Sequence, residues 1–575
     1  MKRGLQDSPV LLSLAALALA LVQWWPALRK LDATGFGDWQ MVHHNWEAGR
    51  VALLRHGEWP LWDPYHCGGV TILGNPESQL YSPLFLLALP LGTTLAIKLF
   101  LVLHIAAALL GVYLWGRLDY DLPRVPALAA AVTWALSGCF AWDGAGGHAT
   151  FLPFAFAPWI LMCFERARES VAFLVATALL ITLALFEGGT YPVPYFAVLL
   201  GFEVLRRMVT GPERSSPLVA AAAIGALVAL CGAVRLIPIA LSLGDTPRTV
   251  ESTDALLPAE LLEILTTREH GWFWKPHPYV WPEYGSYIGW AAVGLGALGL
   301  LAALGRGRRH LIAGVLLFAL LTAGNLGALY PWPLLHQLPV FDSLRVPSRF
   351  AILLTLYVAI LAAHGLAWLL ARLPEHRAVT TLALVCVLAH TADLVHATQP
   401  IASLWRDPPI TQQPPAKRFH QVSVSGVDYP KLFASFPQRN VGSGACYVGG
   451  MNWQVSPHIW HGDKAQARLA RGKGRLLAIE RTPHRITIGV ELDEPATVVI
   501  NQNHAPGFSA SAGEMFEHRG RLAVAVPAGD RQLEVVYRPY WFLPSAVVSA
   551  VGLLLSVALI WRARRRSRGT SAAAA

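Results

Sequence analysis

Residues 9–28 read PVLLSLAALALALVQWWPAL, and residues 29–39 continue as RKLDATGFGDW. The first stretch has no charged residue and is long enough for an α-helix to cross the roughly 30 Å hydrocarbon core of a bilayer. Trp24, Trp25 and Pro26 stand where a signal peptide would carry small residues for cleavage. We therefore expect this helix to remain as a membrane anchor.

The rest of the chain continues this pattern. Of its 575 residues, 54% are hydrophobic and 14% are charged, whereas soluble domains carry about 25% charged residues. The mean hydropathy is +0.43. Further apolar runs lie at about 94–116, 123–142, 150–164, 170–186, 190–209, 216–244, 286–304, 310–330, 349–371, 378–397 and 541–561. The sequence predicts an α-helical polytopic membrane protein with about twelve transmembrane helices, and it excludes disordered, fibrous and ordinary soluble proteins.

The net charge of +10 indicates topology rather than a nucleic-acid partner. No basic stripe is interleaved with aromatic residues, so nucleic acid is not expected to bind. The arginines cluster in alternate loops, as cytoplasmic loops do. These clusters lie at 117–124, 166–168, 206–214, 306–309, 372–377 and 562–568. We expect a multi-pass protein of the bacterial inner membrane with both termini in the cytoplasm, with Arg29 and Lys30 as the main exception.

Three parts are predicted. Residues 1–397 form a transmembrane domain with a large first outside loop at 29–93, and residues 541–575 form the last transmembrane helix and a basic cytoplasmic tail. Residues 398–540 face the periplasm, and their second half alternates in the strand period, which predicts a β-sandwich. The expected strands are Arg475–Glu480, Arg485–Glu491, Thr497–Asn501, Arg521–Val526 and Gln532–Tyr537, with a hairpin turn at Pro527–Asp530 and a Pro-rich linker at Pro408–Pro415.

The first outside loop contains the strongest candidate for chemistry. Apolar positions between residues 39 and 56 suit a helix lying along the membrane surface, and Asp38 precedes it. Asp is a preferred N-cap, so Asp38 is explained by capping alone. It is also explained as a general base that takes a proton from an incoming hydroxyl. The two roles are compatible, because a capping carboxylate keeps a second oxygen.

Other polar residues of this loop are weaker candidates for substrate binding. Asp63 precedes a proline and Glu77 follows Asn-Pro, so both also fit turns. His66 lies just after the first of these turns. His43 and His44 are adjacent and point about 100° apart on a helix. No histidine or carboxylate is spaced for a shared metal, so no metal site is predicted.

Basic residues further along could bind an anion at the outer interface. Arg345 and Arg349 flank the start of a helix, where they either bind a phosphate or extend to the headgroups. Arg235 lies about twenty residues into its span and therefore near the outer interface. Lys275, in a Trp-rich loop, could add a donor, although an aromatic belt also explains that loop.

Cysteines point to no zinc or redox motif, because the six of them include no CxxC pair. Cys67 and Cys446 are the two that clearly lie outside, in a compartment that permits disulfides. They either bridge the first loop to the sandwich or remain two free thiols.

The order of several short motifs resembles the bacterial YfhO-type membrane proteins. These motifs are Gly37-Asp38, Trp59–Tyr65, Gly74–Ser78, Tyr81–Pro83, Leu344–Phe350, Val526–Gly529 and Val536–Pro539. That family is similar to the GT-C glycosyltransferases, membrane enzymes that pass a sugar from a polyprenyl-phosphate donor to an acceptor on the outer side.

The resemblance implies roles for individual residues. Asp38 matches the acidic base of the first outside loop, and Arg345 and Arg349 are the nearest match to arginines that bind the donor phosphate. One base suffices, because the leaving group is already a phosphate and needs no second carboxylate. His504–Phe508 departs from the expected aromatic pair and Pro-Gly-Trp, which weakens a sugar-binding role for that face of the sandwich.

The implied partners are a polyprenyl-phosphate sugar, an envelope glycan, lipid or protein acceptor, and membrane lipids. No cofactor beyond the lipid-linked donor is required, and a divalent metal is an open alternative. Two other functions compete. A flippase for a lipid-linked sugar would usually show two matching halves with broken helices, which this sequence lacks. A non-catalytic envelope assembly protein would tolerate the loss of Asp38.

Overall fold

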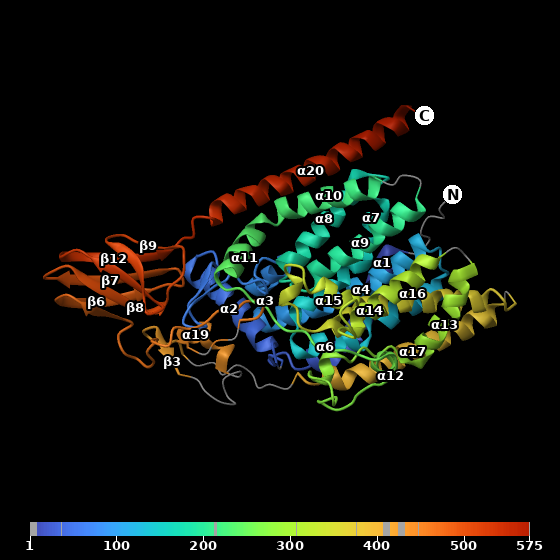
Figure 1. The fold of residues 1–575 in the computed structure, drawn as a ribbon, viewed down its shortest axis with the longest axis horizontal. Coiled ribbons are helices and arrows are strands. Elements are labelled where there is room, and N and C mark those ends of the chain that lie inside the picture. The colour runs from blue at the N-terminus through green and yellow to red at the C-terminus, as the bar shows by residue number, and fades with distance from the viewer. Residues whose placement is uncertain are drawn as a thin grey trace.

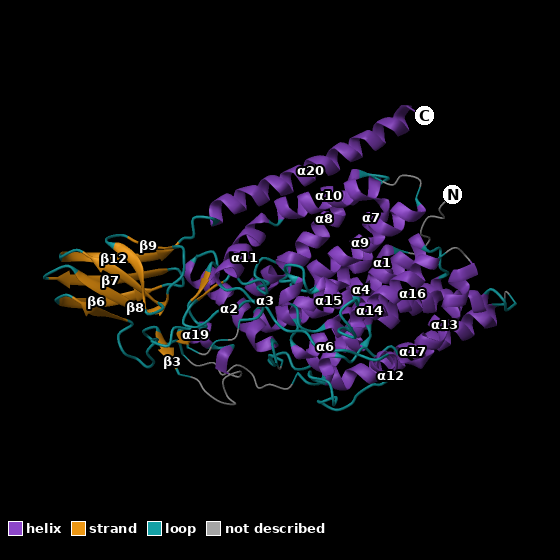
Figure 2. Ribbon diagram, in the orientation of Figure 1, coloured by secondary structure: helices purple, strands orange, loops and turns teal. Residues whose placement is uncertain are grey.

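The computed structural model describes residues 8–35, 37–211, 215–305, 308–374, 376–405, 414–423, 432–444, 446 and 448–573, with side chains given up to residue 565. Figures 1 and 2 show a large helical body with a β-rich region at one end. Both chain ends are marked at the opposite end of that body. The predicted fold class, a polytopic helical membrane protein with a C-terminal β-sandwich, is confirmed.

Every predicted apolar run contains helix, although the run at 310–330 is helical only as far as Ala323. The helices are α1 (Pro9–Leu28), α4 (Thr93–Asp119), α5 (Arg124–Ala135), α6 (Gly138–Gly146), η2 (Ala149–Phe156), α7 (Ala157–Arg166), α8 (Val171–Phe186), α9 (Pro192–Thr210), α10 (Ser216–Cys231), α11 (Ala233–Asp245), α13 (Gly289–Gly305), α14 (Arg309–Ala323), α16 (Ala351–Leu370), α17 (Arg377–Ala402) and α20 (Phe542–Ala573). Among the described residues, six helical stretches are long and apolar enough to cross a membrane, or up to seven if α10 and α11, bent by 82°, form one span. Three shorter apolar helices accompany them, so the count of twelve spans stays a prediction.

α4 runs from one end of the helical body to the other. It begins at Thr93, which donates a hydrogen bond to Glu47 of the first loop. It ends at Asp119, which pairs with Arg166 of α7 at 2.5 Å. Its 27 residues span roughly 40 Å at about 1.5 Å per residue. The first loop and the Arg166 cluster therefore lie on opposite sides of an apolar slab of membrane thickness.

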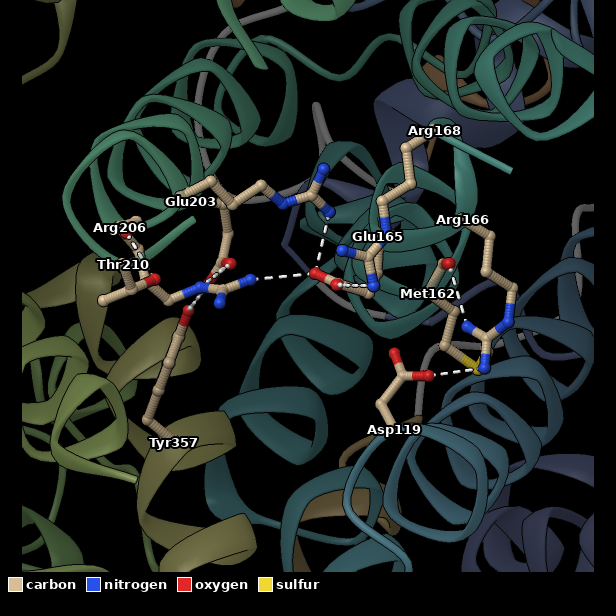
Figure 3. A network of polar contacts seen from close by, with 10 residues as sticks. Asp119, Met162, Glu165, Arg166, Arg168, Glu203, Arg206, Thr210 and Tyr357 are labelled. Atoms are coloured by element: carbon tan, nitrogen blue, oxygen red, sulfur yellow. Dashed lines mark hydrogen bonds and ion pairs between the residues drawn. The ribbon is translucent and has the colours of Figure 1, made fainter. Parts of the chain in front are cut away.

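Figure 3 shows the polar network at the end that holds Asp119. Glu165 of α7 accepts hydrogen bonds from Arg206 and Arg207 of α9, each at 2.8 Å. Glu203 pairs with Arg206 at 2.6 Å and accepts from the Tyr357 hydroxyl at 3.2 Å. Loops that the charge pattern places together on the inside thus meet at one end. Parts of three predicted inside clusters, Arg214, Arg306 and the side chains of 566–568, lie outside the described residues.

The first loop folds into elements of its own between the helical body and the β-rich region (Figure 1). The helix predicted at 39–56 is α2 (Trp39–His56), but most of its residues are buried inside the protein, so its position along the membrane surface stays a prediction. It is followed by the short paired strands β1 (Trp62–Asp63) and β2 (Val70–Thr71), and then by η1 (Pro83–Leu87) and α3 (Ala88–Leu91). The later outside loops contain α12 (Pro258–Thr266), η3 (Trp281–Glu283), α15 (Pro331–Leu335), η4 (Phe341–Ser343) and η5 (Pro347–Phe350).

Two four-stranded sheets form the sandwich, in the orders β10-β11-β8-β5 and β6-β7-β12-β9. The strands are β5 (Ala467–Arg471), β6 (Gly474–Arg481), β7 (Arg485–Leu492), β8 (Ala496–Asn503), β9 (Phe508–Ala510), β10 (Glu514–His518), β11 (Arg521–Val526) and β12 (Gly529–Tyr537). Ile488 and Leu533 of one sheet share a buried core with Val498 and Val524 of the other. The predicted hairpin at Pro527–Asp530 is wrong, because β11 and β12 belong to different sheets and the turn crosses between them.

The region before the sandwich packs on the first loop. α17 continues to Ala402, beyond the predicted boundary at 397, and most of the predicted linker at 408–415 lies outside the described residues. The next described elements are β3 (His420–Val422), α19 (Phe436–Arg439) and β4 (Val441–Ser443). The side chains of Phe433 and Phe436 are buried against Met41 and Val51 of α2.

Cys67 and Cys446 form a disulfide with a Cα–Cα distance of 4.4 Å, so the bridge is the correct alternative of the two. Backbone hydrogen bonds flank it: the Gly68 amide donates to the Ser443 carbonyl at 2.8 Å, and the Asn503 amide donates to the Gly68 carbonyl at 2.7 Å. The first loop, the segment that carries Cys446 and the sandwich are therefore fixed to one another.

Candidate functional site

A polar cavity of about 250 Å³ lies where the first loop meets the helical body. Several segments distant in sequence contribute to its wall, and all lie in or beside loops that the charge pattern places outside. The lining residues are Asp38, Met41, Val42, Glu77, Gln79, Gly147, His148, Thr150, Phe151, Tyr191, Arg248, Arg345, Arg349, Val448, Gly449 and Met451. Four of the residues selected from the sequence, Asp38, Glu77, Arg345 and Arg349, are thus brought together.

Asp38 is positioned by a close backbone contact. It occupies the N-cap position of α2, but its carboxylate makes no capping hydrogen bond, so the capping role of the side chain is not observed. The Asp38 amide donates to the Gly146 carbonyl at 2.9 Å. At the next residue, Gly147, φ is +86°, and an added Cβ would lie 2.0 Å from the Trp39 nitrogen. Only glycine permits this approach, which holds the Asp38 carboxylate at the cavity wall.

His148 is the nearest cation to Asp38. Its Nε2 lies 3.9 Å from the Asp38 carboxylate, and its Nδ1 donates to Asp143 at 3.2 Å. Burial disfavours the imidazolium, but the hydrogen bond to Asp143 and the charge of Glu283 outweigh it and raise the pKa of His148 to about 9. Burial likewise raises the pKa of Asp38, while His148 opposes the rise. A protonated His148 therefore favours the ionised form of Asp38.

Glu77 enters the same cavity from a tight turn. The Asn75 side chain accepts a hydrogen bond from the Glu77 amide at 3.0 Å, as expected for a turn of this type. A Cβ on Gly188 would lie 2.5 Å from the Glu77 carbonyl oxygen, and a Cβ on Gly449 would lie 1.7 Å from its Oε2. Burial, followed by repulsion from Asp38, raises the pKa of Glu77 to about 7. Glu77 therefore exchanges a proton near neutral pH.

Arg349 is held rigidly at the wall of the cavity. Its Nε and Nη2 donate to the two carboxylate oxygens of Glu283 at 2.8 and 2.9 Å. Its guanidinium also lies over the rings of Phe151 (4.7 Å) and Tyr191 (4.4 Å). Burial would raise the pKa of Glu283, but Arg349 lowers it to about 2, so the pair is fully ionised. Nη1 of Arg349 donates no hydrogen bond to any acceptor within the described parts of the chain.

Arg248 and Arg345 are the two arginines of the cavity wall that are not held by an ion pair of their own within the described chain. Arg345 is exposed, and its guanidinium lies 5.6 Å from the centre of the Tyr279 ring. Neither arginine makes an ion pair with a carboxylate among the residues that the structure describes. Because Glu283 neutralises Arg349, these two cations are the ones left to attract an anion such as a phosphate.

Arg235 does not line the cavity, in contrast to its predicted role in substrate binding. It is fully buried, and its guanidinium donates to the carbonyls of Leu73 (2.7 Å), Asn75 (2.9 Å) and Ser78 (3.1 Å), with longer contacts to those of Ile72 and Pro76. Arg235 does lie beside the first loop, but its guanidinium N–H groups are already bonded to backbone carbonyls of that loop. Arg235 thus fixes the turn that presents Glu77.

Asp63, His66 and Lys275 also lie outside the cavity. Asp63 and His66 are almost fully buried beneath the first loop, at 1% and 2% exposure. Lys275 is exposed on a turn of the loop between α12 and η3. Their predicted contact with substrate is therefore not supported by their placement in the structure.

Two residues of the cavity wall, His148 and Arg248, and the partner of Arg349, Glu283, were not predicted from the sequence. His148 ends a Gly-Gly-His turn after an apolar run, and the paired glycines were the available signal. Glu283 stands in a Trp-Pro-Glu-Tyr stretch that an aromatic belt explains equally well. Arg248 follows Thr-Pro in a long loop, and nothing in its surroundings distinguishes it from other surface arginines.

No family model matches this chain, and no curated protein is similar to it. Among solved structures, the chain is similar to the arabinofuranosyltransferase AftD from Mycobacteria, with 17% identity and a TM-score of 0.45 over 78% of this chain and 32% of that one. A mutant form of AftD gives 16% identity and a TM-score of 0.44 over 78% of this chain and 33% of that one. The chain thus spans about a third of the length of these structures. At this identity the likeness concerns the fold alone.

Proposed function

We propose that the protein is a YfhO-type membrane glycosyltransferase of the GT-C class. It would transfer a sugar from a polyprenyl-phosphate donor to an envelope acceptor on the outer side of the bacterial inner membrane. The observation that carries this proposal is the composition of the cavity. It combines the carboxylate of Asp38 with two arginines, Arg248 and Arg345, that make no direct ion pair with a carboxylate of the described chain.

The proposed step uses Asp38 as the general base. The acceptor hydroxyl oxygen forms a bond to the anomeric carbon of the sugar, and the bond from that carbon to the phosphate oxygen breaks. The hydroxyl proton passes to the Asp38 carboxylate, and polyprenyl phosphate leaves with the bonding electrons. Inversion at the anomeric carbon follows, because base and leaving group act on opposite faces of the sugar.

Arg248 and Arg345 would bind the phosphate, and Arg349 would orient it through its remaining Nη1. The negative charge on the leaving phosphate grows as the bond to sugar breaks, so cations placed there stabilise the transition state more than the ground state. A lipid phosphate arriving from the bilayer would meet these cations at the membrane interface. The pairing of Arg349 with Glu283 keeps the guanidinium in place before the donor arrives.

The experiment is a transfer assay with purified protein in lipid, a polyprenyl-phosphate sugar and envelope extract. Asp38→Asn should lower the transfer rate by about 10²- to 10⁴-fold, the usual contribution of a general base. The matched control is Asp32→Asn, because Asp32 is an exposed carboxylate of the same loop that does not line the cavity. Retained transfer in Asp38→Asn would refute the base, and donor crossing of the membrane without sugar transfer would identify a flippase instead.

A further inference from the structure

A cluster of side chains that could bind a metal ion lies outside the cavity, in the buried contact between α2 and the β1–β2 turn. His44, Asp63 and His66 each offer one ligand atom, and these three atoms lie within 4.8 Å of one another. Their exposures are 0%, 1% and 2%. The proposed transfer reaction uses none of them, so the cluster needs an explanation of its own.

The hydrogen bonds of His44 require a proton or a metal ion between its ring and Asp63. Nδ1 of His44 lies 2.9 Å from the Phe433 carbonyl oxygen, which can only accept, so Nδ1 carries a proton. Nε2 of His44 lies 2.8 Å from Oδ2 of Asp63. In a neutral ring that nitrogen would point a lone pair at a carboxylate oxygen. Either a proton or a metal ion must therefore lie between them.

His66 distinguishes these two occupants. A proton shared by His44 and Asp63 needs no third ligand, whereas a metal ion does. His66 is placed to be that third ligand, because one of its ligand atoms lies within 4.8 Å of those of both His44 and Asp63. Asp63 is oriented for the same purpose, because its Oδ1 accepts from the Tyr65 amide at 2.8 Å while Oδ2 faces His44.

We propose that His44, Asp63 and His66 bind a divalent transition-metal ion, with Zn²⁺ as the best fit. Zinc bound at about 2.0–2.1 Å in a tetrahedron separates its ligand atoms by about 3.4 Å. The shortest separation here is 2.8 Å, and the longest is within 4.8 Å, so small side-chain shifts would create that geometry. Two imidazoles and one carboxylate suit zinc better than Ca²⁺ or Mg²⁺, which prefer oxygen ligands.

The surroundings match those of metal-binding histidines in general. A ligating histidine usually donates its second ring N–H to a carbonyl or carboxylate, as His44 does to Phe433. The ring of Phe433 also stacks on His44 with centroids 4.0 Å apart. Phe433 would thus both orient the His44 ring and cover one side of the ion.

The bound ion would join three segments of chain. His44 belongs to α2, Asp63 to β1, and His66 directly precedes the disulfide residue Cys67. Asp38 begins the same helix, about 9 Å from His44 along its axis at about 1.5 Å per residue. The ion would therefore fix the direction of α2 and the entry of the β1–β2 turn without contacting the cavity.

The test is metal analysis of the full-length protein, purified in detergent with an affinity tag that contains no histidine. Inductively coupled plasma mass spectrometry should find about one zinc ion per chain. His66→Gln and Asp63→Asn should each retain less than about a tenth of that amount, because loss of a ligand weakens binding strongly. The control His458→Gln should retain all of it, because His458 is an exposed residue of the C-terminal region.

A second measurement keeps the test valid if a variant misfolds. Wild-type protein stripped by a strong chelator should bind Co²⁺ and develop the visible absorption bands of a tetrahedral site. Zinc-edge X-ray absorption should show two imidazole ligands. If the wild-type protein contains no stoichiometric metal and the stripped protein takes up neither Zn²⁺ nor Co²⁺, a proton occupies the site and the proposal is overturned. None of these readouts depends on sugar transfer.

Discussion

Replacing Glu77 with glutamine, E77Q, tests the electrostatics of the cavity while almost preserving its shape. The pKa of Glu77 is raised from an ordinary value of 4.5 to about 7, chiefly by burial and then by Asp38. A folded-state pKa above the unfolded one means that the folded protein binds this proton more tightly. The stabilising contribution is complete below about pH 4.5 and is lost as the pH rises through about 7.

The magnitude follows from the same shift. A rise from 4.5 to about 7 corresponds to about 3 kcal/mol at about 1.4 kcal/mol per unit, so ionised Glu77 destabilises the folded protein by up to about that amount above pH 7. Glutamine carries no charge at any pH. E77Q should therefore be about as stable as the wild type at about pH 5 and more stable, by up to about 3 kcal/mol, at about pH 8.5.

The assay is unfolding in detergent followed by tryptophan fluorescence, at both pH values. Glu251→Gln serves as the control, because Glu251 is an exposed glutamate that does not line the cavity. It should change stability by the same small amount at each pH. A difference between E77Q and the wild type that does not depend on pH would refute the reasoning, because only titration of Glu77 makes the difference vary.

Two further predictions concern residues that hold the cavity together. His148→Gln removes the cation 3.9 Å from Asp38, so the pKa of Asp38 should rise and the acid limb of the pH–rate profile should shift to higher pH; an unchanged limb would exclude this coupling. Arg235→Met leaves the buried carbonyls of residues 72–78 without donors. It should therefore destabilise the protein by about 3–5 kcal/mol, measured as a lowered thermal transition, and open the Glu77 turn to limited proteolysis. Arg235→Lys should recover part of both effects, whereas wild-type behaviour of Arg235→Met would contradict the clamp.

The sequence predicted those features that depend on local pattern. Every apolar run contains helix, and Arg521–Val526 is a strand with the predicted bounds, because periodicity and turn residues act over a few positions. The turn after that strand was misread, since Pro-Ala-Gly-Asp suits a hairpin and a crossing between sheets equally well. The choice depends on which strands pair, and that is settled by packing of the whole sandwich.

The candidate site, too, was predicted only where the signal was local in the sequence. Asp38 and Glu77 were found because a carboxylate in an outside loop of a charge-poor chain is conspicuous. His148 was missed because its approach to Asp38 depends on the Gly147 backbone meeting Trp39, a contact between segments more than 100 residues apart. The grouping of His44 with His66 was missed for a related reason, since spacing rules consider one element at a time.

The disulfide between Cys67 and Cys446 has a consequence for biogenesis. Its two cysteines are 379 residues apart, and the turn at 448–451 that follows the second one completes the wall around Glu77. Most of the helices must therefore be synthesised and inserted, and the start of the C-terminal region must be exported, before the cavity wall is complete. A nascent or truncated chain would carry Asp38 and every cavity arginine and still lack this part of the cavity wall.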